Sequence, residues 1–307
     1  MNRYILILIT GIIFLASCED VIDVELPENE PRLIVNGVIR VDETKEFLPI
    51  EILFTESSSF FEENTIASIE SAIIYYGTPN LDAPEILEGG GVSNLIELEP
   101  GSGIWVPDPT FDSDQRIRIS NINEGDVFQL IIETNYEQYF ATTTYVKSVP
   151  IDSLEQGDQT LFSGDETEVI VTFTDRAGSD DYYVLDLDFG EYLVTEDKFY
   201  QGQTFVFSYF YENNLGLNTS SVIEISLLGA DKTFFNYMNQ IIVQSGGDQG
   251  PFQTPAATVR GNIINITGID NDEVFDNVER SDNFALGYFA IVEEYKDSIV
   301  ITDNETN

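Results

Sequence analysis

Apolar and polar side chains alternate along most of the chain from Leu33 onward, and this period of two predicts β-strands. In the first half, strand-like runs lie on either side of Asn36-Gly37 and near 50–54, 69–76, 127–134 and 139–146. In the second half they lie near 169–173, 183–189, 205–209, 223–227 and 284–292. Alternation buries one face of each strand, as antiparallel sheets do, and no βαβ rhythm is present. We therefore expect a mainly β protein.

One segment replaces this alternation with a helical period. Its apolar side chains recur at positions i, i+3, i+4, i+7 and i+8, which are occupied by Phe234, Tyr237, Met238, Ile241 and Ile242. Asp231 is a suitable N-cap, and Gly246-Gly247 is a suitable stop. The pattern predicts a helix near 231–245 that packs on the sheet of the second half.

Pro150 interrupts the strand pattern near the middle of the chain and suggests a domain boundary. We expect a two-domain β-sandwich architecture. The first domain, 31–149, is predicted to be an immunoglobulin-like or transthyretin-like sandwich. The second, 150–300, is predicted to be a β domain that carries the helix, followed by a tail over 301–307. An acidic tether over 18–30 precedes both domains.

The first residues have the pattern of an exported protein. Arg3 is followed by an apolar stretch from Ile5 to Leu15, which is shorter than the about 20 residues that a membrane-spanning helix needs. The stretch ends in Leu15-Ala16-Ser17-Cys18, which resembles a bacterial lipobox. We expect 1–17 to be a lipoprotein signal peptide and Cys18 to be lipidated, so that the mature chain is anchored to the membrane without spanning it.

Acidic residues follow the lipobox directly. Glu19, Asp20 and Asp23 resemble the export signal of surface lipoproteins in Bacteroidota, although Val21 and Ile22 interrupt the acidic run. This resemblance favours an outer-membrane protein exposed at the cell surface. The alternatives are a periplasm-facing lipoprotein and a simple acidic tether.

Composition narrows the range of partners and chemistries. The 307 residues include 55 acidic and 13 basic ones, giving a formal net charge of −42, with no histidine and one cysteine. Such a surface repels phosphate backbones, which argues against nucleic acid as a partner. The lack of histidine excludes Ser-His-Asp catalysis and zinc sites that need imidazole. One cysteine excludes an intrachain disulfide.

No familiar catalytic motif is present. The sequence lacks G-x-S-x-G, S-x-x-K, Walker A and G-x-G-x-x-G. Glycosidases need only two carboxylates, but any pair chosen among 55 acidic residues carries no information. We therefore expect a protein that is not an enzyme and has no catalytic residues and no cofactor.

Calcium is the ion that this composition allows, because it takes carboxylate and carbonyl oxygens. Two acidic clusters are candidate calcium sites. They are Asp108, Asp112 and Asp114, and Asp270, Asp272, Glu273 and Asp276. Neither matches the EF-hand loop, so we expect solvated loops and no metal. Trp105 and Tyr209-Phe210-Tyr211 are candidate ligand platforms, for which core or sheet packing is the favoured interpretation.

Several stretches together resemble a known family. They are 18–27, 31–37, Val149-Pro150-Ile151-Asp152-Ser153-Leu154, 246–263 and Leu286-Gly287-Tyr288-Phe289. With these, the chain resembles the Bacteroidota outer-membrane lipoprotein family known as domain of unknown function forty-two forty-nine. The resemblance implies work beside a TonB-dependent transporter, either capturing ligand or covering the transporter mouth, and it supplies no catalytic residues. Alternatives are an adhesin or structural surface protein and, third, a carboxylate-based polysaccharide-active enzyme.

The glycine- and proline-rich segment after the helix is the candidate partner loop, and its members of interest are Gly246, Gly247, Phe252 and Gly261. The alternative is structural: tight turns follow the helix, and Phe252 seals the second domain. Gly261 and Gly287 lie next to strand residues, where a missing side chain allows close backbone approach or a bulge.

Overall fold

The computed structural model describes residues 31–58, 64–161, 164, 166–212, 215, 217, 220–245, 258–267 and 284–302. The strands of the first half are β1 (Leu33–Val41), β2 (Ile52–Glu56), β3 (Thr65–Ile66), β4 (Ile69–Pro79), β5 (Leu87–Glu97), β6 (Ile104–Pro107), β7 (Val127–Thr134) and β8 (Gln138–Thr144). Those of the second half are β9 (Ile151–Gln156), β10 (Thr167–Thr174), β11 (Tyr182–Asp186), β12 (Tyr192–Glu196), β13 (Thr204–Tyr211), β14 (Val222–Ala230), β15 (Ile263–Asn265) and β16 (Leu286–Val300). The helix α2 spans Lys232–Ser245, and the short 3-10 helices η1 and η2 span Ile119–Asn121 and Asp197–Phe199.

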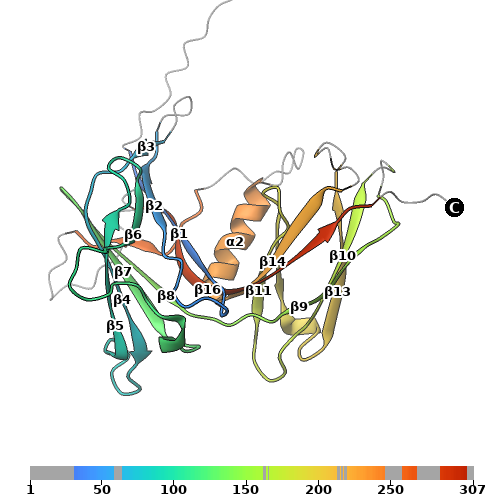
Figure 1. Cartoon of the computed structure of the whole chain (residues 1–307), viewed down its shortest axis with the longest axis horizontal. Helices are drawn as coiled ribbons and strands as arrows, with labels where there is room; N and C mark the ends of the chain where they lie inside the picture. Colours follow the sequence, from blue (N-terminus) through green and yellow to red (C-terminus); the bar gives the residue numbers. More distant parts are fainter. Residues whose placement is uncertain are drawn as a thin grey trace, which may run out of the picture. The chain divides into compact units, whose positions relative to one another are not determined.

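The strands form two sheets (Figure 1). The larger has 13 strands in the order β12-β11-β14-β16-β1-β2-β6-β5-β4-β7-β8-β15, with β3 beside β2. The smaller has the order β13-β10-β9. The mainly β prediction is confirmed, and the sandwich description is compatible with these sheets.

The long strand β16 takes part in both halves of the chain. From Leu286 to Glu293 it pairs with β1 in parallel, and from Glu294 to Val300 it pairs antiparallel with β14. In its first part, both faces are buried. Phe289 and Ile291 belong to the core of the first half. The alternate residues pack in the cluster that includes Phe234 of α2; they are Tyr288, Ala290 and Val292. An unbroken apolar run is what a strand covered on both faces requires.

Residues near the end of the described chain thus pack into the core of the first half. Ile263 of β15 and Ala285 also pack into that core, beside residues of β1, β2 and β4. A separate core lies between the β9-β10-β13 sheet and strands β11 and β14. The predicted division at residue 149 stays a prediction. The structure adds that β15 and β16, which follow this position, contribute to the core of the first half.

Several predicted strands differ in their extent, among them the last, which is expected near 284–292 and spans Leu286–Val300. The runs around Asn36-Gly37 form the single strand β1, in which a Cβ at Gly37 would lie 3.3 Å from the Phe289 ring. Glycine here allows close packing and makes no turn. The strand expected to reach residue 189 ends at Asp186, because Asp188 and Phe189 adopt left-handed backbone angles, with φ of 66° and 53°.

The helix prediction is confirmed together with its cap. The Asp231 carboxylate accepts a hydrogen bond from the Phe234 amide at 2.7 Å. This bond satisfies a donor that the first turn of a helix otherwise leaves free. Phe234 is buried, and the Tyr237 ring lies 4.7 Å from that of Tyr288, centroid to centroid. Ile241, expected to lie on the packed face, is 37% exposed.

Candidate functional site

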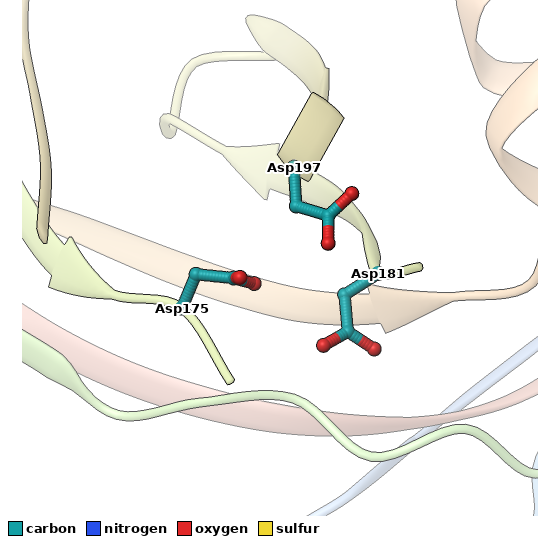
Figure 2. Close-up of side chains that lie close together, drawn as sticks. All are labelled: Asp175, Asp181 and Asp197. Atoms are coloured by element: carbon teal, nitrogen blue, oxygen red, sulfur yellow. The ribbon is translucent and has the colours of Figure 1, made fainter. Parts of the chain in front are cut away.

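Three buried carboxylates meet beside the second core (Figure 2). Asp175 follows the last residue of β10, Asp181 directly precedes β11, and Asp197 begins η2 directly after β12. Each offers a carboxylate oxygen, and these oxygens lie within 4.8 Å of one another. Each residue is 5% exposed. We call these residues the acidic triad.

Backbone hydrogen bonds hold the ends of these strands together. The Asp197 amide donates to the Asp181 carbonyl at 3.1 Å, and the Asp175 amide donates to the Gln203 carbonyl at 3.1 Å. The turn is closed by the Tyr200 amide, which donates to the Asp197 carbonyl at 2.8 Å. Backbone geometry therefore brings the three aspartates together.

Two of the three carboxylates are well supplied with donors. Asp175 accepts from the Tyr183 hydroxyl at 2.7 Å and from the Gly202 amide at 2.8 Å. Asp181 accepts from Arg176 at 2.7 and 3.2 Å and from the Ser179 hydroxyl at 2.7 Å. These bonds fix both side chains in place.

Asp197 differs from its two neighbours. Its Oδ2 atom is buried and has no hydrogen-bond partner, and Figure 2 shows its carboxylate directed toward the space between the other two side chains. Burial raises the pKa of Asp197, and the negative charges of Asp175 and Asp181 raise it further. Desolvation and like charges both disfavour an ionised carboxylate, so this site favours a proton or a cation.

The acidic cluster expected at Asp108, Asp112 and Asp114 has a different character. Asp108 accepts from the Thr110 amide at 2.7 Å, and Asp114 forms a two-pronged pair with Arg116 at 2.9 Å for both bonds. The Arg116 hydrogen bonds lower the pKa of Asp114 to about 2. Within the described ranges, the acidic triad is the group whose geometry suits a metal ion, and these three residues are not part of it. Asp108, Phe111 and Asp114 are among the residues that line a cavity of about 320 Å³.

The candidate aromatic platforms pack largely as core residues. Trp105 is 8% exposed and lies edge-on to Phe54, with ring centroids 6.0 Å apart. The buried Tyr211 donates its hydroxyl to the Leu187 carbonyl at 2.7 Å. Tyr209, Phe210 and Tyr211 line a cavity of about 240 Å³ with Glu191. The favoured core interpretation is confirmed for Trp105 and Tyr211.

Gly261 and Gly287 allow the close approach that the sequence predicted. A Cβ at Gly261 would lie 1.6 Å from the Gly287 carbonyl oxygen, and one at Gly287 would lie 2.0 Å from that of Val35. Gly287 also has a φ of 84°. Asn262 fastens the contact, because its side chain accepts from the Phe289 amide at 2.9 Å and donates to the Phe289 carbonyl at 2.7 Å. Gly261 therefore has a structural role.

Other predicted site residues lie outside the described residues. They are Cys18, Glu19, Asp20, Asp23, Gly246, Gly247, Phe252, Asp270, Asp272, Glu273 and Asp276. Sequence reasoning missed the acidic triad, because its members are separated by 6 and 16 positions among 55 acidic residues. No local spacing marks them, and only strand pairing brings them together.

Comparison with known proteins adds a family and two distant structural likenesses. A family model described as a domain of unknown function, DUF4249, matches residues 19–272. No curated protein matches the chain. A crystal structure of a DUF4785 family protein from Legionella pneumophila is similar at 14% identity and a TM-score of 0.21, over 59% of this chain and 48% of that one. A structure of a 1.5-MDa bacterial ice-binding adhesin is similar at 11% identity and a TM-score of 0.17, over 66% of this chain and 59% of that one.

In both comparisons, the matched region covers only part of the other chain. The chain spans about half of the Legionella protein and about three fifths of the adhesin chain. In the part of the chain that the structure describes, no helix combines the length and apolar character needed to cross a membrane.

Proposed function

The chain belongs to the family of domains of unknown function DUF4249. We propose that it is a non-enzymatic lipoprotein of the outer-membrane surface, and that it assists a TonB-dependent transporter, as its family resemblance implies. It captures ligand for the transporter or covers its mouth. The observation that carries the lipoprotein assignment is the motif Leu15-Ala16-Ser17-Cys18 ahead of a mainly β body, whereas the transporter partner rests on the family resemblance. Two or three acyl chains on Cys18 anchor such a protein firmly, whereas one chain holds weakly.

The burial of the acidic triad does not suit glycoside hydrolysis. A glycosidase needs two carboxyl groups that reach the sugar, about 5–5.5 Å apart in retaining enzymes and about 6.5–9.5 Å apart in inverting ones. The acidic triad is 5% exposed at each residue and has oxygens within 4.8 Å of one another. A polymeric substrate has no access to groups buried in this way. The acidic triad is therefore not the carboxylate pair of a polysaccharide-active enzyme.

The end of α2 supports a contact with a partner protein. Its first turns are packed, but Ile241 and Val243 in its last turn are 37% and 54% exposed. This turn leads directly into the candidate partner loop, which rejoins the described chain near the anchored Gly261. With a net charge of −42, general attraction to an anionic cell surface does not operate. A local apolar patch with a polar rim is the contact that remains.

The lipid anchor is tested by metabolic labelling with a fatty-acid probe. We expect label on the wild type and none on Cys18→Ala, because the thiol is the acceptor. Equal labelling of the two would contradict the anchor. Surface display is tested by protease added to intact cells, where replacement of Glu19, Asp20 and Asp23 by alanine protects the protein. Protection of the wild type would place it on the periplasmic face.

The transporter contact is tested by mild-detergent purification after crosslinking. Val243→Glu is the test variant, and Val206→Glu on β13 is the matched control, because Val206 is exposed to a similar extent at 57%. An outer-membrane barrel protein is expected to co-purify with the wild type and the control and to be lost with Val243→Glu. Absence of any barrel from the wild type would contradict the proposal, and retained attachment of cells to a surface through the protein would favour an adhesin.

A further inference from the structure

We propose that Asp175, Asp181 and Asp197 bind a divalent cation, and that Ca²⁺ is the ion their donors fit best. This site is independent of the transporter role. The first observation is spacing: one oxygen from each residue lies within 4.8 Å of the others. Ca²⁺ binds oxygens at about 2.3–2.6 Å, so two oxygens on opposite sides of one ion are about 5 Å apart. A single ion reaches all three side chains.

The second observation is the buried Oδ2 atom of Asp197, which lacks a hydrogen-bond partner. The residue is 5% exposed, and its carboxylate is directed toward the other two (Figure 2). Buried polar atoms in folded proteins nearly always have a partner. The Tyr183 hydroxyl and the Gly202 amide are already committed to Asp175. A bound cation supplies the missing partner of Asp197.

Charge balance points the same way. Arg176 is the cation in contact with the acidic triad, and it binds Asp181 at 2.7 Å while its other nitrogen binds Glu124 at 2.8 Å. Its single charge is therefore shared between two carboxylates, and no basic side chain of the described residues forms an ion pair with Asp175 or Asp197. A divalent ion neutralises these two. Each oxygen of an ionised carboxylate has two lone pairs, so the bonds to Asp175 and Asp181 leave room for an ion.

Donor type selects the ion. The site offers carboxylate oxygens and no imidazole or thiolate, which favours a hard cation over zinc or copper. Mg²⁺ demands near-ideal octahedral geometry and keeps its water, whereas Ca²⁺ accepts flexible arrangements completed by carbonyls and water. A partly hydrated Ca²⁺ therefore suits three carboxylates from three separate strand ends.

The test is a Ca²⁺ titration of the full-length lipoprotein in detergent, after treatment with a chelator. The test variant is Asp197→Asn, and the matched control is Asp112→Asn, an exposed aspartate of the other acidic segment. We expect one saturable site in the wild type, above the weak binding of an acidic surface, and a rise in Tm of about 5 °C at a hundredfold excess over Kd. Asp197→Asn should weaken this site at least tenfold, and Asp112→Asn should leave it unchanged.

A second readout uses Tb³⁺ in place of Ca²⁺. The Tyr183 hydroxyl lies 2.7 Å from an Asp175 oxygen, close enough for tyrosine-sensitised emission that Ca²⁺ displaces. If Asp197→Asn fails to fold, Asp175→Asn replaces it; its amide oxygen keeps one of the two bonds that Asp175 accepts from Tyr183 and Gly202. Loss of the emission in the triad variant supports the site. Wild-type protein without a saturable site, or equal affinity in wild type and triad variant, would overturn it and leave a proton on Asp197.

Discussion

Two acidic regions of this protein contain aspartates whose pKa values shift in opposite directions. In the segment from Asp108 to Arg116, Asp114 is exposed and takes its hydrogen bonds from Arg116, two positions away, which lowers its pKa to about 2. In the acidic triad, the carboxylates come from three strand ends and are buried, and the pKa of Asp197 is raised. In the first region Asp112 and Asp114 are exposed as expected, but Asp108 is buried at 8% exposed, contrary to the expected solvated loop. In the second, pairing of strands brings buried carboxylates together, which gives a site with different chemistry.

The largest expected effect follows from breaking the pair between Arg176 and Asp181. In Asp181→Ala, the guanidinium loses both of its bonds to a carboxylate that is 6% exposed at its side chain. Arg176, 29% exposed, keeps its bond to Glu124, but Asp181 is the buried acceptor of three hydrogen bonds, including that of Ser179. Losing it costs about 3 kcal/mol. We expect the urea midpoint to fall accordingly. An unchanged midpoint would show that relief of repulsion among the carboxylates offsets the loss.

A second buried carboxylate lies outside the acidic triad, beside Glu43, and also has a raised pKa. Glu293 is 2% exposed, accepts from the Ser148 amide at 2.6 Å, and has a pKa raised to about 7, mainly by burial. The folded protein therefore holds a proton that the unfolded chain releases near 4.5. This contribution to stability is complete below that value and is lost as the pH rises through about 7.

The prediction is a difference in pH profile. Between pH 4.5 and 8 the wild type should lose about 2–3 kcal/mol relative to Glu293→Gln, whose amide still accepts from Ser148. Chemical unfolding at several pH values measures this, with the exposed Glu224→Gln as control. The Ca²⁺ response should persist in Glu293→Gln, because this residue lies outside the acidic triad. Parallel profiles for all three proteins would refute the prediction.

A smaller effect is expected from removing a single hydrogen bond inside the acidic triad. Tyr183→Phe deletes the donor that Asp175 Oδ1 receives at 2.7 Å and keeps the ring that packs on Phe173. The free energy of unfolding should fall by about 1–2 kcal/mol. With saturating Ca²⁺, the loss in the free energy of unfolding should be smaller, because the bound ion replaces the hydrogen-bond donor that the Asp175 carboxylate has lost. A loss independent of Ca²⁺ would place the ion away from Asp175.

The smallest effect belongs to the exposed segment. Asp114→Asn breaks the pair with Arg116, but both side chains are about half exposed, at 45% and 56%. Exposed ion pairs contribute little and are screened by salt. We expect no measurable change in the unfolding midpoint. A change as large as that of Asp181→Ala would remove the distinction between the two regions.

Local patterns in the sequence were sufficient for the elements but not for their partners. Alternation located most strands, and the position of Asp231 predicted the cap of α2 because capping depends on residues three apart. The position of Gly261 and Gly287 next to strand residues indicated close backbone approach or a bulge, and the structure shows close approach. Alternation carries no information on pairing, so the parallel contact of β16 with β1 was not foreseen. The acidic triad depends on that level of structure, since β10, β11 and β12 bring its members together.

The most direct measurement is the anomalous signal of crystals soaked in Mn²⁺ or Tb³⁺. The account predicts one strong peak between Asp175, Asp181 and Asp197, within coordinating distance of Asp197 Oδ2, and no comparable peak beside Asp108, Asp112 or Asp114. A strong peak at the exposed segment, or none at the acidic triad, would contradict the claim that burial and convergence, rather than local acidity, make the cation site.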